Sequence, residues 1–315
     1  MNAVAAQRRV VDGVLLLNKP RGLTSQQAVA RVKRLYNALK AGHTGTLDPM
    51  ADGLLPIGLG EATKFSRFLL DADKQYLATL RLGVTTTTGD AEGEVLQEQP
   101  VAVTVADLPA VLARFGGEQL QTPPMHSALK VAGKPLYVYA RAGVVLERTA
   151  RAIFVNELQL VDFKDDILTL RVKCSKGTYV RVLAEDIGAA LGCGAHLIAL
   201  TREAAGGFDL AHAVSLDTLA ELPVAGRESR LLPVDAFAGN LPRLDLDAAA
   251  ALRLVRGQPV AAAPAAPGLY RLYDASGGFL GIGENGSAAL QVQRLIGQSQ
   301  AAGSPNGLSN PAVTG

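Results

Sequence analysis

The sequence is poor in aromatic residues and in cysteine. It contains no tryptophan, and aromatic residues make up only 5% of its 315 residues. Any aromatic stacking surface must therefore be built from a few individual side chains. The two cysteines, Cys174 and Cys193, show no CxxC or Cys/His spacing, which argues against a zinc site. We expect both to be small buried residues in a reducing compartment.

Long hydrophobic runs and a strong charge bias are also missing. The apolar run from Val14 to Leu17 is long enough only for a strand, so no membrane span is predicted. Asp12 interrupts the hydrophobic stretch after Arg8 and Arg9, and we expect no signal peptide and a soluble cytoplasmic protein. The net charge of +2 is too small for a non-specific nucleic-acid binder, so a polyanionic partner would need locally concentrated positive charge.

Several common catalytic motifs are absent from the sequence. It has no Walker A loop, no HExxH and no GxSxG elbow. Residues 281–286 match GxGxxG, but neither a following helix nor an acid about 20 residues later is predicted, as dinucleotide binding would require. We interpret these glycines as part of a β-turn. No cofactor and no metal site are predicted.

Hydrophobic periodicity predicts an α+β protein. Strands are predicted at 14–17, 76–82 and 168–174, where buried positions run continuously or alternate. Thr24, with Gln27 three residues later, forms a capping-box pattern before an amphipathic helix. A second helix with apolar positions at Leu183, Ile187 and Leu191 should end at Gly192. Residues 243–296 resemble a small β-rich module, and the Ser/Asn/Pro/Gly-rich segment 298–315 is predicted to be disordered.

Charge is segregated along the chain. Residues 85–110 contain five acidic residues and no lysine or arginine, and we expect this segment to face away from a polyanion. Residues 121–151 contain one acidic residue, with Tyr137 and Tyr139 interleaved among basic side chains. The basic residues are Lys130, Lys134, Arg141, Arg148 and Arg151. The segment is a candidate RNA-gripping insertion, and a basic surface hairpin without a partner is the alternative.

Residues 41–60 are rich in glycine and threonine and are predicted to form a structured loop. Gly42 and Gly45 permit a tight backbone path, and Pro49 biases Asp48 toward extended geometry. Leucines supply an apolar wall nearby. A single acid held beside apolar surface suits a nucleophile or a general base. On spacing alone, a turn whose aspartate accepts backbone hydrogen bonds explains the pattern equally simply.

A family resemblance decides between these interpretations. The run Gly42-His43-Thr44-Gly45-Thr46-Leu47-Asp48-Pro49 closely resembles the catalytic motif of the TruB family of bacterial tRNA pseudouridine-55 synthases. Similar blocks follow in the family's order and extend the resemblance over roughly residues 13–235. These blocks are 17–25, 60–64, 74–76, 83–93, 121–130 and 175–188.

The resemblance implies a fold and an activity. It implies an α+β pseudouridine synthase catalytic domain at 1–240, with a mixed, mostly antiparallel sheet. Short motifs at 256–258 and 279–283 resemble a PUA-type RNA-binding domain, which implies a PUA-like β-barrel at 241–297. The implied enzyme is an isomerase that converts the uridine at position 55, in the T loop of tRNA, to pseudouridine by base flipping and aspartate nucleophilic catalysis. It would act as a monomer, with the tRNA T arm as its partner and with no cofactor, guide RNA, membrane or obligatory protein partner.

The same resemblance implies roles for individual residues. Asp48 stands at the nucleophile's position, Tyr76 at that of the tyrosine that packs on the target base, and Arg181 at that of the arginine that pairs with the aspartate. The remaining matches carry substrate-binding roles. Tyr179 and Leu200 would line the uracil pocket, His43 would assist flipping, and Lys19 and Lys64 match basic or loop-bracing positions.

This sequence departs from the family pattern at two places. His126 stands where an aromatic residue is expected, and Thr201 stands where a cation is expected, so the contacts expected there are in doubt. Two other functions remain: an RNA-binding or tRNA-folding protein that acts without catalysis, and a synthase that depends on a guide RNA. The sequence does not decide whether Asp48 attacks the sugar or the base, nor the oligomeric state.

Overall fold

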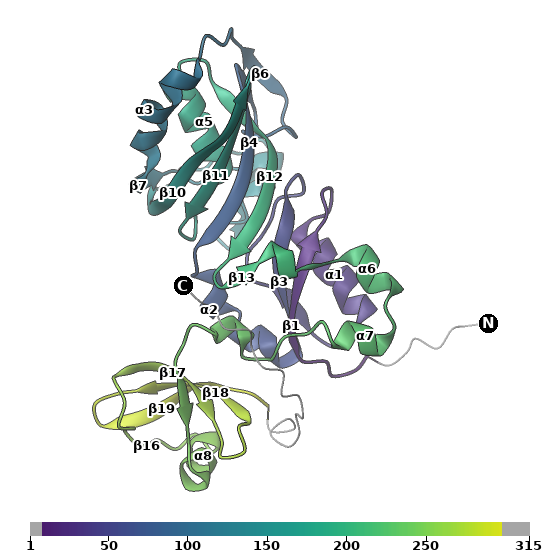
Figure 1. Ribbon diagram of the computed structural model, residues 1–315, viewed down its shortest axis with the longest axis vertical. Coiled ribbons are helices and arrows are strands. Elements are labelled where there is room, and N and C mark those ends of the chain that lie inside the picture. The colour runs from purple at the N-terminus through teal and green to yellow at the C-terminus, as the bar shows by residue number, and fades with distance from the viewer. Residues whose placement is uncertain (1–7, 298–315) are drawn as a thin grey trace, which may run out of the picture.

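The computed structural model describes residues 8–297, so the predicted disordered segment 298–315 lies outside the described residues. Two separate sheets dominate the molecule, a ten-stranded sheet and a five-stranded sheet. Figure 1 shows the larger sheet running along the upper part of the molecule and the smaller sheet at its lower end.

One half of the large sheet is built around β1 (Gly13–Lys19) and β3 (Asp52–Leu59), which are antiparallel with Leu17 opposite Leu55. Both strands are buried along almost their whole length, which explains their continuous apolar sequences. The helix α1 (Ser25–Leu35) begins at the predicted capping box of Thr24 and Gln27. The short strand β14 (Val214–Ser215) lies parallel to β1.

The segment 41–60 is only partly a loop. Its two ends form β2 (Ala41–His43) and β3, which pair with each other antiparallel. The prediction of a loop over the whole segment was wrong, because its ends gain hydrogen bonds from long-range strand pairing that local composition does not reveal. The part between the strands, residues 44–51, is the loop that carries Asp48.

The other half of the large sheet contains the strands predicted from alternation. The strand β4 (Lys74–Leu82) pairs antiparallel with β11 (Ile167–Cys174), followed by β10 (Arg151–Lys164) and β7 (Gly117–Gln121). The strand β12 (Ala195–Ala205) joins the halves, because it pairs antiparallel with β4 and parallel with β3. The sheet is therefore mixed and mostly antiparallel, as predicted.

Helix α5 (Val180–Ala190) precedes β12 and packs against it. Gly192 follows the helix with φ of 80°, the left-handed conformation predicted for a residue just past a helix end. The remaining elements are shorter. They are η1 (Gly60–Phe65), α2 (Arg67–Leu70), β5 (Val84–Thr86), β6 (Val95–Glu98), η2 (Val105–Asp107), α3 (Leu108–Leu112), η3 (Ala113–Phe115), β8 (Lys130–Val131), β9 (Lys134–Pro135), α4 (Leu136–Arg141), β13 (Phe208–Asp209), η4 (Leu210–His212), α6 (Leu216–Glu221), α7 (Val224–Glu228) and η5 (Ala236–Ala238).

The small sheet has the strand order β15-β17-β18-β19-β16. Its strands and its helix are β15 (Arg243–Asp245), α8 (Ala248–Val255), β16 (Val260–Ala261), β17 (Gly268–Tyr273), β18 (Phe279–Asn285) and β19 (Ala289–Leu295). The edge strands β15 and β16 do not pair with each other in the described part of the chain. The sheet is thus a curled half-barrel, as Figure 1 shows, and this is the form that the expected PUA-like β-barrel takes.

The GxGxxG match at 281–286 lies mainly in β18, between β17 and β19. A Cβ atom on Gly281 would lie 2.1 Å from the carbonyl oxygen of Arg294. Close approach of the neighbouring strand therefore requires this glycine, so the interpretation of a β-turn was wrong for Gly281, whereas Gly286 does lie in the turn between β18 and β19. In the described residues after the motif, up to residue 297, no helix follows it, so the structure gives no support for a dinucleotide site.

A shared apolar cluster joins the two sheets. Phe237 and Phe65 from the large part of the molecule pack in one buried cluster with Ile282 of β18. Phe65 and Phe279 form an edge-to-face pair with ring centroids 5.2 Å apart. The C-terminal sheet is therefore packed against η1 and η5 through a hydrophobic contact, in addition to its covalent link.

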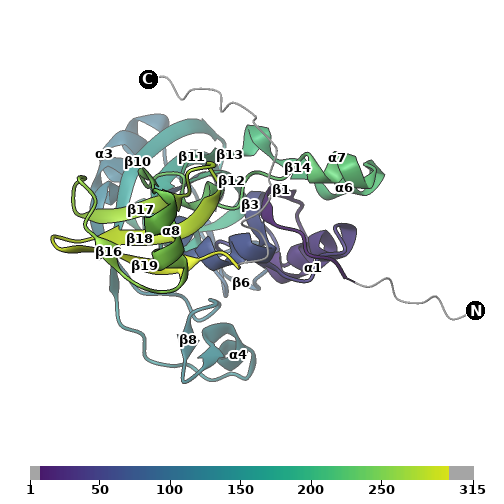
Figure 2. The same cartoon turned by 90° about the horizontal axis from the view of Figure 1, so that it is seen from below.

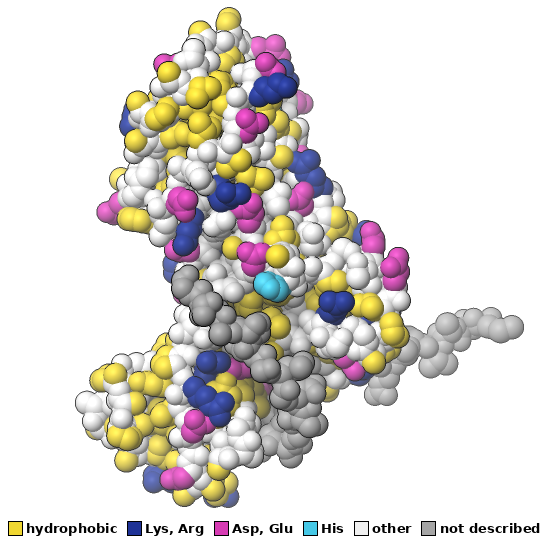
Figure 3. Space-filling model, viewed as in Figure 1, with side chains coloured by type: hydrophobic (Ala, Val, Ile, Leu, Met, Phe, Trp, Pro, Cys, Tyr) yellow, Lys and Arg dark blue, Asp and Glu magenta, His cyan; other side chains and the backbone are white. Residues whose placement is uncertain are grey.

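Cys174 and Cys193 are both buried and unoxidised, as predicted. Among residues 8–297, no helix is long and apolar enough to cross a membrane. Figure 3 shows that basic and acidic side chains are interspersed with hydrophobic ones on one face of the molecule. This face has no continuous basic surface, in keeping with the small net charge of +2.

Candidate active site

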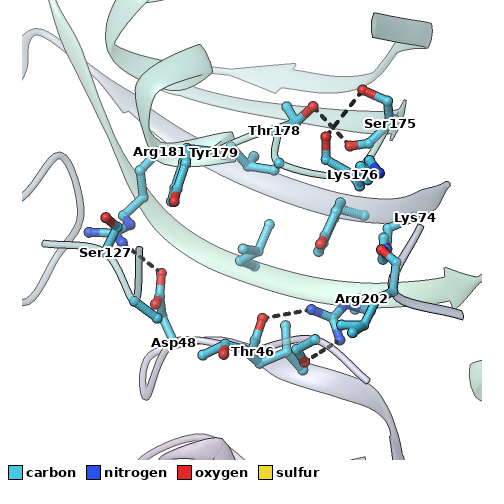
Figure 4. A pocket seen from close by; sticks show the side chains of 18 residues that line it. Thr46, Asp48, Lys74, Ser127, Ser175, Lys176, Thr178, Tyr179, Arg181 and Arg202 are labelled. Carbon is cyan, nitrogen blue, oxygen red and sulfur yellow. Dashed lines mark hydrogen bonds and ion pairs between the residues drawn. The ribbon is translucent and has the colours of Figure 1, made fainter. Parts of the chain in front are cut away.

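A cavity of about 290 Å³ lies between the Asp48 loop, the start of α5 and the strands β4 and β12. Ser127 and Ala128, from the base of the basic insertion, also line it. Figure 4 shows Asp48, Tyr179 and Arg181 at one end of this cavity and Lys74 and Arg202 at the other. The lining residues come from five distant parts of the sequence, so this site exists only in the folded chain.

The loop carrying Asp48 is held from below by Ser25. The backbone nitrogen of Leu47 donates to the Ser25 hydroxyl at 2.8 Å, and that hydroxyl donates to the Leu47 carbonyl oxygen at 3.0 Å. Burial raises the pKa of the Asp48 carboxyl, and the neighbouring Arg181 opposes this rise. Asp48 is thus a partly buried acid whose ionised form depends on a cation beside it.

That cation is buried and holds several segments together. Arg181, at the start of α5, is 6% exposed, and its guanidinium lies 3.0 Å from the Asp48 carboxylate. It also lies 3.3 Å from the Asp90 carboxylate, and it donates to the carbonyl oxygens of Thr88 (3.3 Å) and His126 (2.7 Å). One side chain therefore ties the Asp48 loop to both the acidic segment and the basic insertion.

Asp90 belongs to the acidic segment 85–110, which is expected to face away from a polyanion, yet its side chain lies beside Arg181 at the site. Asp90 is 3% exposed and accepts hydrogen bonds from the Thr88 hydroxyl at 2.6 Å and the Glu92 backbone nitrogen at 3.0 Å. Burial raises the pKa of the Glu92 carboxyl, and the charges of Asp90 and Asp48 raise it further. Counting charges along a segment does not show that one of its acids turns inward to a buried arginine.

Tyr76 lies on β4 and lines the cavity. Its side chain is 9% exposed, and burial raises the pKa of its phenol. Tyr179 caps α5, and its backbone nitrogen and oxygen bond the Gln121 side chain at 2.7 Å and 3.1 Å. With Leu200 of β12, Tyr76 and Tyr179 contribute apolar surface to the lining of the cavity that Asp48 and Arg181 also line.

The structure thus brings five predicted residues together around the cavity and places three others elsewhere. His43 lies on β2, outside the cavity lining, and its ring bonds the Gly45 backbone nitrogen at 3.2 Å. Burial lowers the pKa of His43, which favours the neutral ring at pH 7. Gln26 lies 3.3 Å from the other ring nitrogen.

The two predicted lysines brace backbone outside the cavity lining. Lys19 is fully buried, and its ammonium donates to the carbonyl oxygens of Leu23 (2.7 Å) and Pro20 (3.0 Å). Burial lowers the pKa of Lys19 to about 8. Lys64 pairs with Glu61 at 2.6 Å and donates to the Leu295 carbonyl oxygen at 3.3 Å, at the contact between the two sheets.

The basic insertion projects from the body of the molecule. Figure 2 shows β8 and α4 in an extension beyond the rest of the fold. Arg148 is half-buried and donates to the Pro123 carbonyl oxygen at 3.3 Å, whereas the guanidinium of Arg141 lies 5.3 Å from the Tyr137 ring centroid. The exposed basic residues of the insertion are Lys130, Lys134, Arg141 and Arg151.

Sequence reasoning assigned no site role to several lining residues, among them Lys74, Ser127 and Arg202. The Lys74 ammonium donates to the carbonyl oxygens of Leu70 and Ala72, and burial lowers its pKa to about 8. For Lys74 and Arg202, the only local signal in the sequence is a basic residue within a strand whose pattern otherwise alternates. Thr201, at the expected cation position, donates to the Asp52 carboxylate at 2.5 Å.

Comparison with known proteins identifies the family. Residues 33–180 match the TruB family pseudouridylate synthase N-terminal domain, and residues 181–237 match the tRNA pseudouridylate synthase B C-terminal domain. Residues 242–296 match the C-terminal region of pseudouridine synthase II TruB. The chain belongs to the TruB family. It is 54% identical over 289 residues to the tRNA pseudouridine synthase B of Azoarcus sp. (strain BH72), covering 92% of this chain and 96% of that protein.

A second TruB relative is equally similar in sequence, and two solved structures have a similar fold. The tRNA pseudouridine synthase B of Burkholderia pseudomallei (strain 1710b) is 55% identical over 296 residues, covering 92% of this chain and 98% of that protein. A solved Cbf5-Nop10-Gar1 complex contains a chain that is 25% identical, with a TM-score of 0.71 over 92% of this chain and 86% of that one. An H/ACA RNP bound to a substrate RNA containing 2'-deoxyuridine contains a chain with the same fold, with a TM-score of 0.70, 24% identity and the same two coverages.

Proposed function

We propose that this TruB family isomerase converts the uridine at position 55, in the T loop of tRNA, to pseudouridine, with Asp48 as its nucleophile. The single observation that carries the proposal is the Asp48 carboxylate at 3.0 Å from the buried Arg181 guanidinium, facing a cavity that Tyr76 also lines. The family membership supports the reaction type, and the geometry supports the assignment of the acid.

The reaction matches the chemistry of the cavity. The bond between the uracil N1 and the ribose C1′ breaks, a bond from C5 to C1′ forms, C5 loses its proton, and N1 gains one. A stacked base cannot be reached inside the loop, so it must be flipped out. The Tyr76 ring then replaces part of the lost stacking. Attack at the ribose C1′ and attack at the base C6 both need an ionised Asp48 carboxylate.

The electrostatics of the site favour that ionised carboxylate. Burial raises the pKa of the Asp48 carboxyl, and the charge of Arg181 and its hydrogen bond to the carboxylate lower it. A charge-assisted pair of this kind is shorter and stronger than a neutral hydrogen bond. We assign Arg181 the role of holding Asp48 ionised and oriented, and we assign Tyr76 the contact with the base.

The remaining predicted residues receive supporting roles. We propose that Tyr179 and Leu200 hold the uracil ring, and that His43 fills the space near the extruded base. Lys19 would brace the segment before α1. Lys64 would brace the junction between the two sheets, where its ammonium donates to the Leu295 carbonyl oxygen.

The exposed basic insertion supports tRNA as the substrate, because phosphate contacts supply much of the affinity in such complexes. We propose that residues 121–151 grip the T arm and that the unit at 241–297, set apart from a catalytic unit at 1–240, adds a second RNA contact. We further propose that the protein acts as a monomer, in the cytoplasm, without a guide RNA or an obligatory protein partner. The alternative is an RNA-folding protein without catalysis, because the insertion could bind RNA even if no reaction takes place in the cavity.

The test is pseudouridine formation by the purified protein alone on an unmodified tRNA transcript, mapped by nucleotide, for wild type and Asp48→Asn. We expect wild type to convert only the T-loop uridine, and the variant to bind the transcript without converting it. Conversion of the uridine by Asp48→Asn would show that Asp48 is not the nucleophile. Binding without conversion by either protein would favour the RNA-folding function, and conversion only after a guide RNA is added would contradict stand-alone action.

A further inference from the structure

We propose that Arg202 is a positioning residue of the reaction, which fixes the Asp48 loop and the Tyr76 ring relative to each other. The proposal rests on the proposed function, because it concerns the same cavity. Arg202 lies on β12, is 2% exposed and lines the cavity opposite Arg181. The hydrogen bonds of Arg202 go to backbone carbonyl oxygens of the Asp48 loop and β3 and not to the Asp48 carboxylate, so it would act through the groups that it holds.

The first contact set joins Arg202 to both ends of the Asp48 loop. One terminal nitrogen donates to the carbonyl oxygens of Gly45 at 3.3 Å and Leu54 at 3.2 Å, and the other donates to that of Thr46 at 2.8 Å. Gly45 and Thr46 precede Asp48, while Leu54 lies in β3 beyond it. Figure 4 shows the guanidinium reaching the loop from the far end of the cavity. One planar group thereby clamps the base of the loop.

The second contact joins the same guanidinium to Tyr76. Arg202 stands opposite Tyr76 in the antiparallel pairing of β12 with β4. Its central carbon lies 5.6 Å from the centroid of the Tyr76 ring, within the range of a cation–π contact. The acid and the aromatic ring are therefore set by one side chain, which is itself fixed by the sheet.

The cost of this arrangement argues for a functional reason. Within residues 8–297, Arg202 forms its hydrogen bonds with carbonyl oxygens and has no carboxylate as an ion-pair partner. A buried cation without a counter-ion is expensive, and an apolar side chain of similar volume often stabilises a fold more. Its charge also favours the ionised form of Asp48, in addition to the larger effect of Arg181. Fold stability alone therefore does not account for an arginine at this position.

Two substitutions of Arg202 distinguish the positioning role of its guanidinium from the effect of its charge. Lysine keeps the positive charge but presents a point charge that cannot donate in fixed directions to three carbonyl oxygens. Methionine removes both the charge and the fork while keeping much of the volume. Arg171 provides the matched control, because its guanidinium pairs at 2.9 Å with Glu203, the residue after Arg202, outside the cavity lining.

The experiment compares wild type with Arg202→Lys, Arg202→Met and Arg171→Met. Single-turnover pseudouridine formation at saturating tRNA, tRNA affinity and the pH dependence of the rate are measured for each. We expect the rate of both Arg202 variants to fall about 100-fold, the cost of a displacement of about 1 Å in a catalytic group. Their tRNA affinity should stay within about threefold of wild type. The acid limb of the pH profile should move to higher pH in Arg202→Met and stay in place in Arg202→Lys.

Two outcomes would overturn the proposal. The first is a rate within threefold of wild type in both Arg202 variants. The second is a loss of rate that matches the loss of folded protein in a melting curve, with the pH profile of the remaining activity unchanged in both. Arg171→Met should behave as wild type throughout. Failure of the proposed function looks different, because wild type itself would then leave the T-loop uridine unconverted.

Discussion

Two segments border the cavity, and the chain fastens them in opposite ways. The Asp48 loop, residues 44–51, is tied by Ser25 from below and by buried arginines at its side. The basic insertion, residues 121–151, has short strands, one short helix and exposed basic side chains. Its base is held by the contact of His126 with Arg181 and by the hydrogen bonds between Gln121 and Tyr179. The comparison teaches that the proposed reacting group is preorganised by buried contacts, whereas the proposed RNA grip presents exposed cations on an extension fastened at its base.

Replacing Arg181, where both segments meet, should have the largest effect. We expect Arg181→Met to lower the single-turnover rate about 1,000-fold or more, because a buried charged partner of the nucleophile is lost. The acid limb of the pH profile should move to higher pH. The sign follows from burial, which raises the pKa of Asp48, while Arg181 lowers it. Rapid-quench kinetics across a pH series would measure both quantities.

The control for Arg181→Met is a measurement showing that the variant is folded. Three other groups depend on Arg181: the carboxylate of Asp90 and the carbonyl oxygens of Thr88 and His126. Melting curves must therefore show that Arg181→Met is folded at the assay temperature. A folded variant with wild-type rate and an unmoved acid limb would contradict the assignment of Arg181.

A smaller and opposite change in pH dependence should follow from Asp90→Asn. The negative charge of Asp90 raises the pKa of Asp48, and Asp90 also shares the Arg181 guanidinium. Removing that charge lowers the pKa of Asp48, so the acid limb should move to lower pH. We expect the rate at pH 7 to fall about 10-fold to 100-fold, because Arg181 loses one of its fixed partners. An acid limb that moves upward would show that Asp90 does not act through Asp48.

Much of the fold was predictable because its signals are local. Alternation along β4 and the capping box at Thr24 depend on residues a few positions apart, and both appear where predicted. The pairing of β2 with β3 and the open edges of the small sheet depend on distant segments. No periodicity within a single segment carries that information.

The site divides in the same way. The Asp48 motif could be recognised because its eight residues, 42–49, are contiguous and follow a familiar pattern. Asp90 and Arg202 were missed because each becomes significant only through a partner far along the chain, Arg181 in one case and Gly45 in the other. Asp90 was also hidden among acids that lie at the surface. Contact partners of buried charges are set by strand pairing and not by local spacing.

Charge reversal in the insertion should change binding and leave chemistry nearly intact. We expect Arg141→Glu to weaken tRNA binding about 10-fold and to reduce the slope of log affinity against log salt by roughly one unit. Arg148→Glu should act similarly on binding and should also lower the melting temperature, because Arg148 donates to Pro123. Filter binding across a salt series, beside single-turnover rates at saturating tRNA, separates the two effects.

Arg81→Glu is the matched control for net charge, because Arg81 is exposed on β4 and pairs with Asp166 away from the insertion. It changes the charge of the protein by the same amount as Arg141→Glu. Equal losses of affinity in the two variants would mean that overall charge, and not a local grip, drives association. Unchanged binding in both Arg141→Glu and Arg148→Glu would remove the insertion from tRNA recognition.

The smallest effect is expected from Lys64→Met, at the junction between the sheets. The Lys64–Glu61 pair is half-buried, and such pairs contribute about 1 kcal/mol or less to the free energy of unfolding. We therefore expect a slightly lower urea midpoint and an unchanged single-turnover rate. A large loss of rate would place Lys64 with the substrate-binding residues despite its distance from the cavity lining. A loss of tRNA affinity alone would instead show that the orientation of the C-terminal sheet matters for RNA contact.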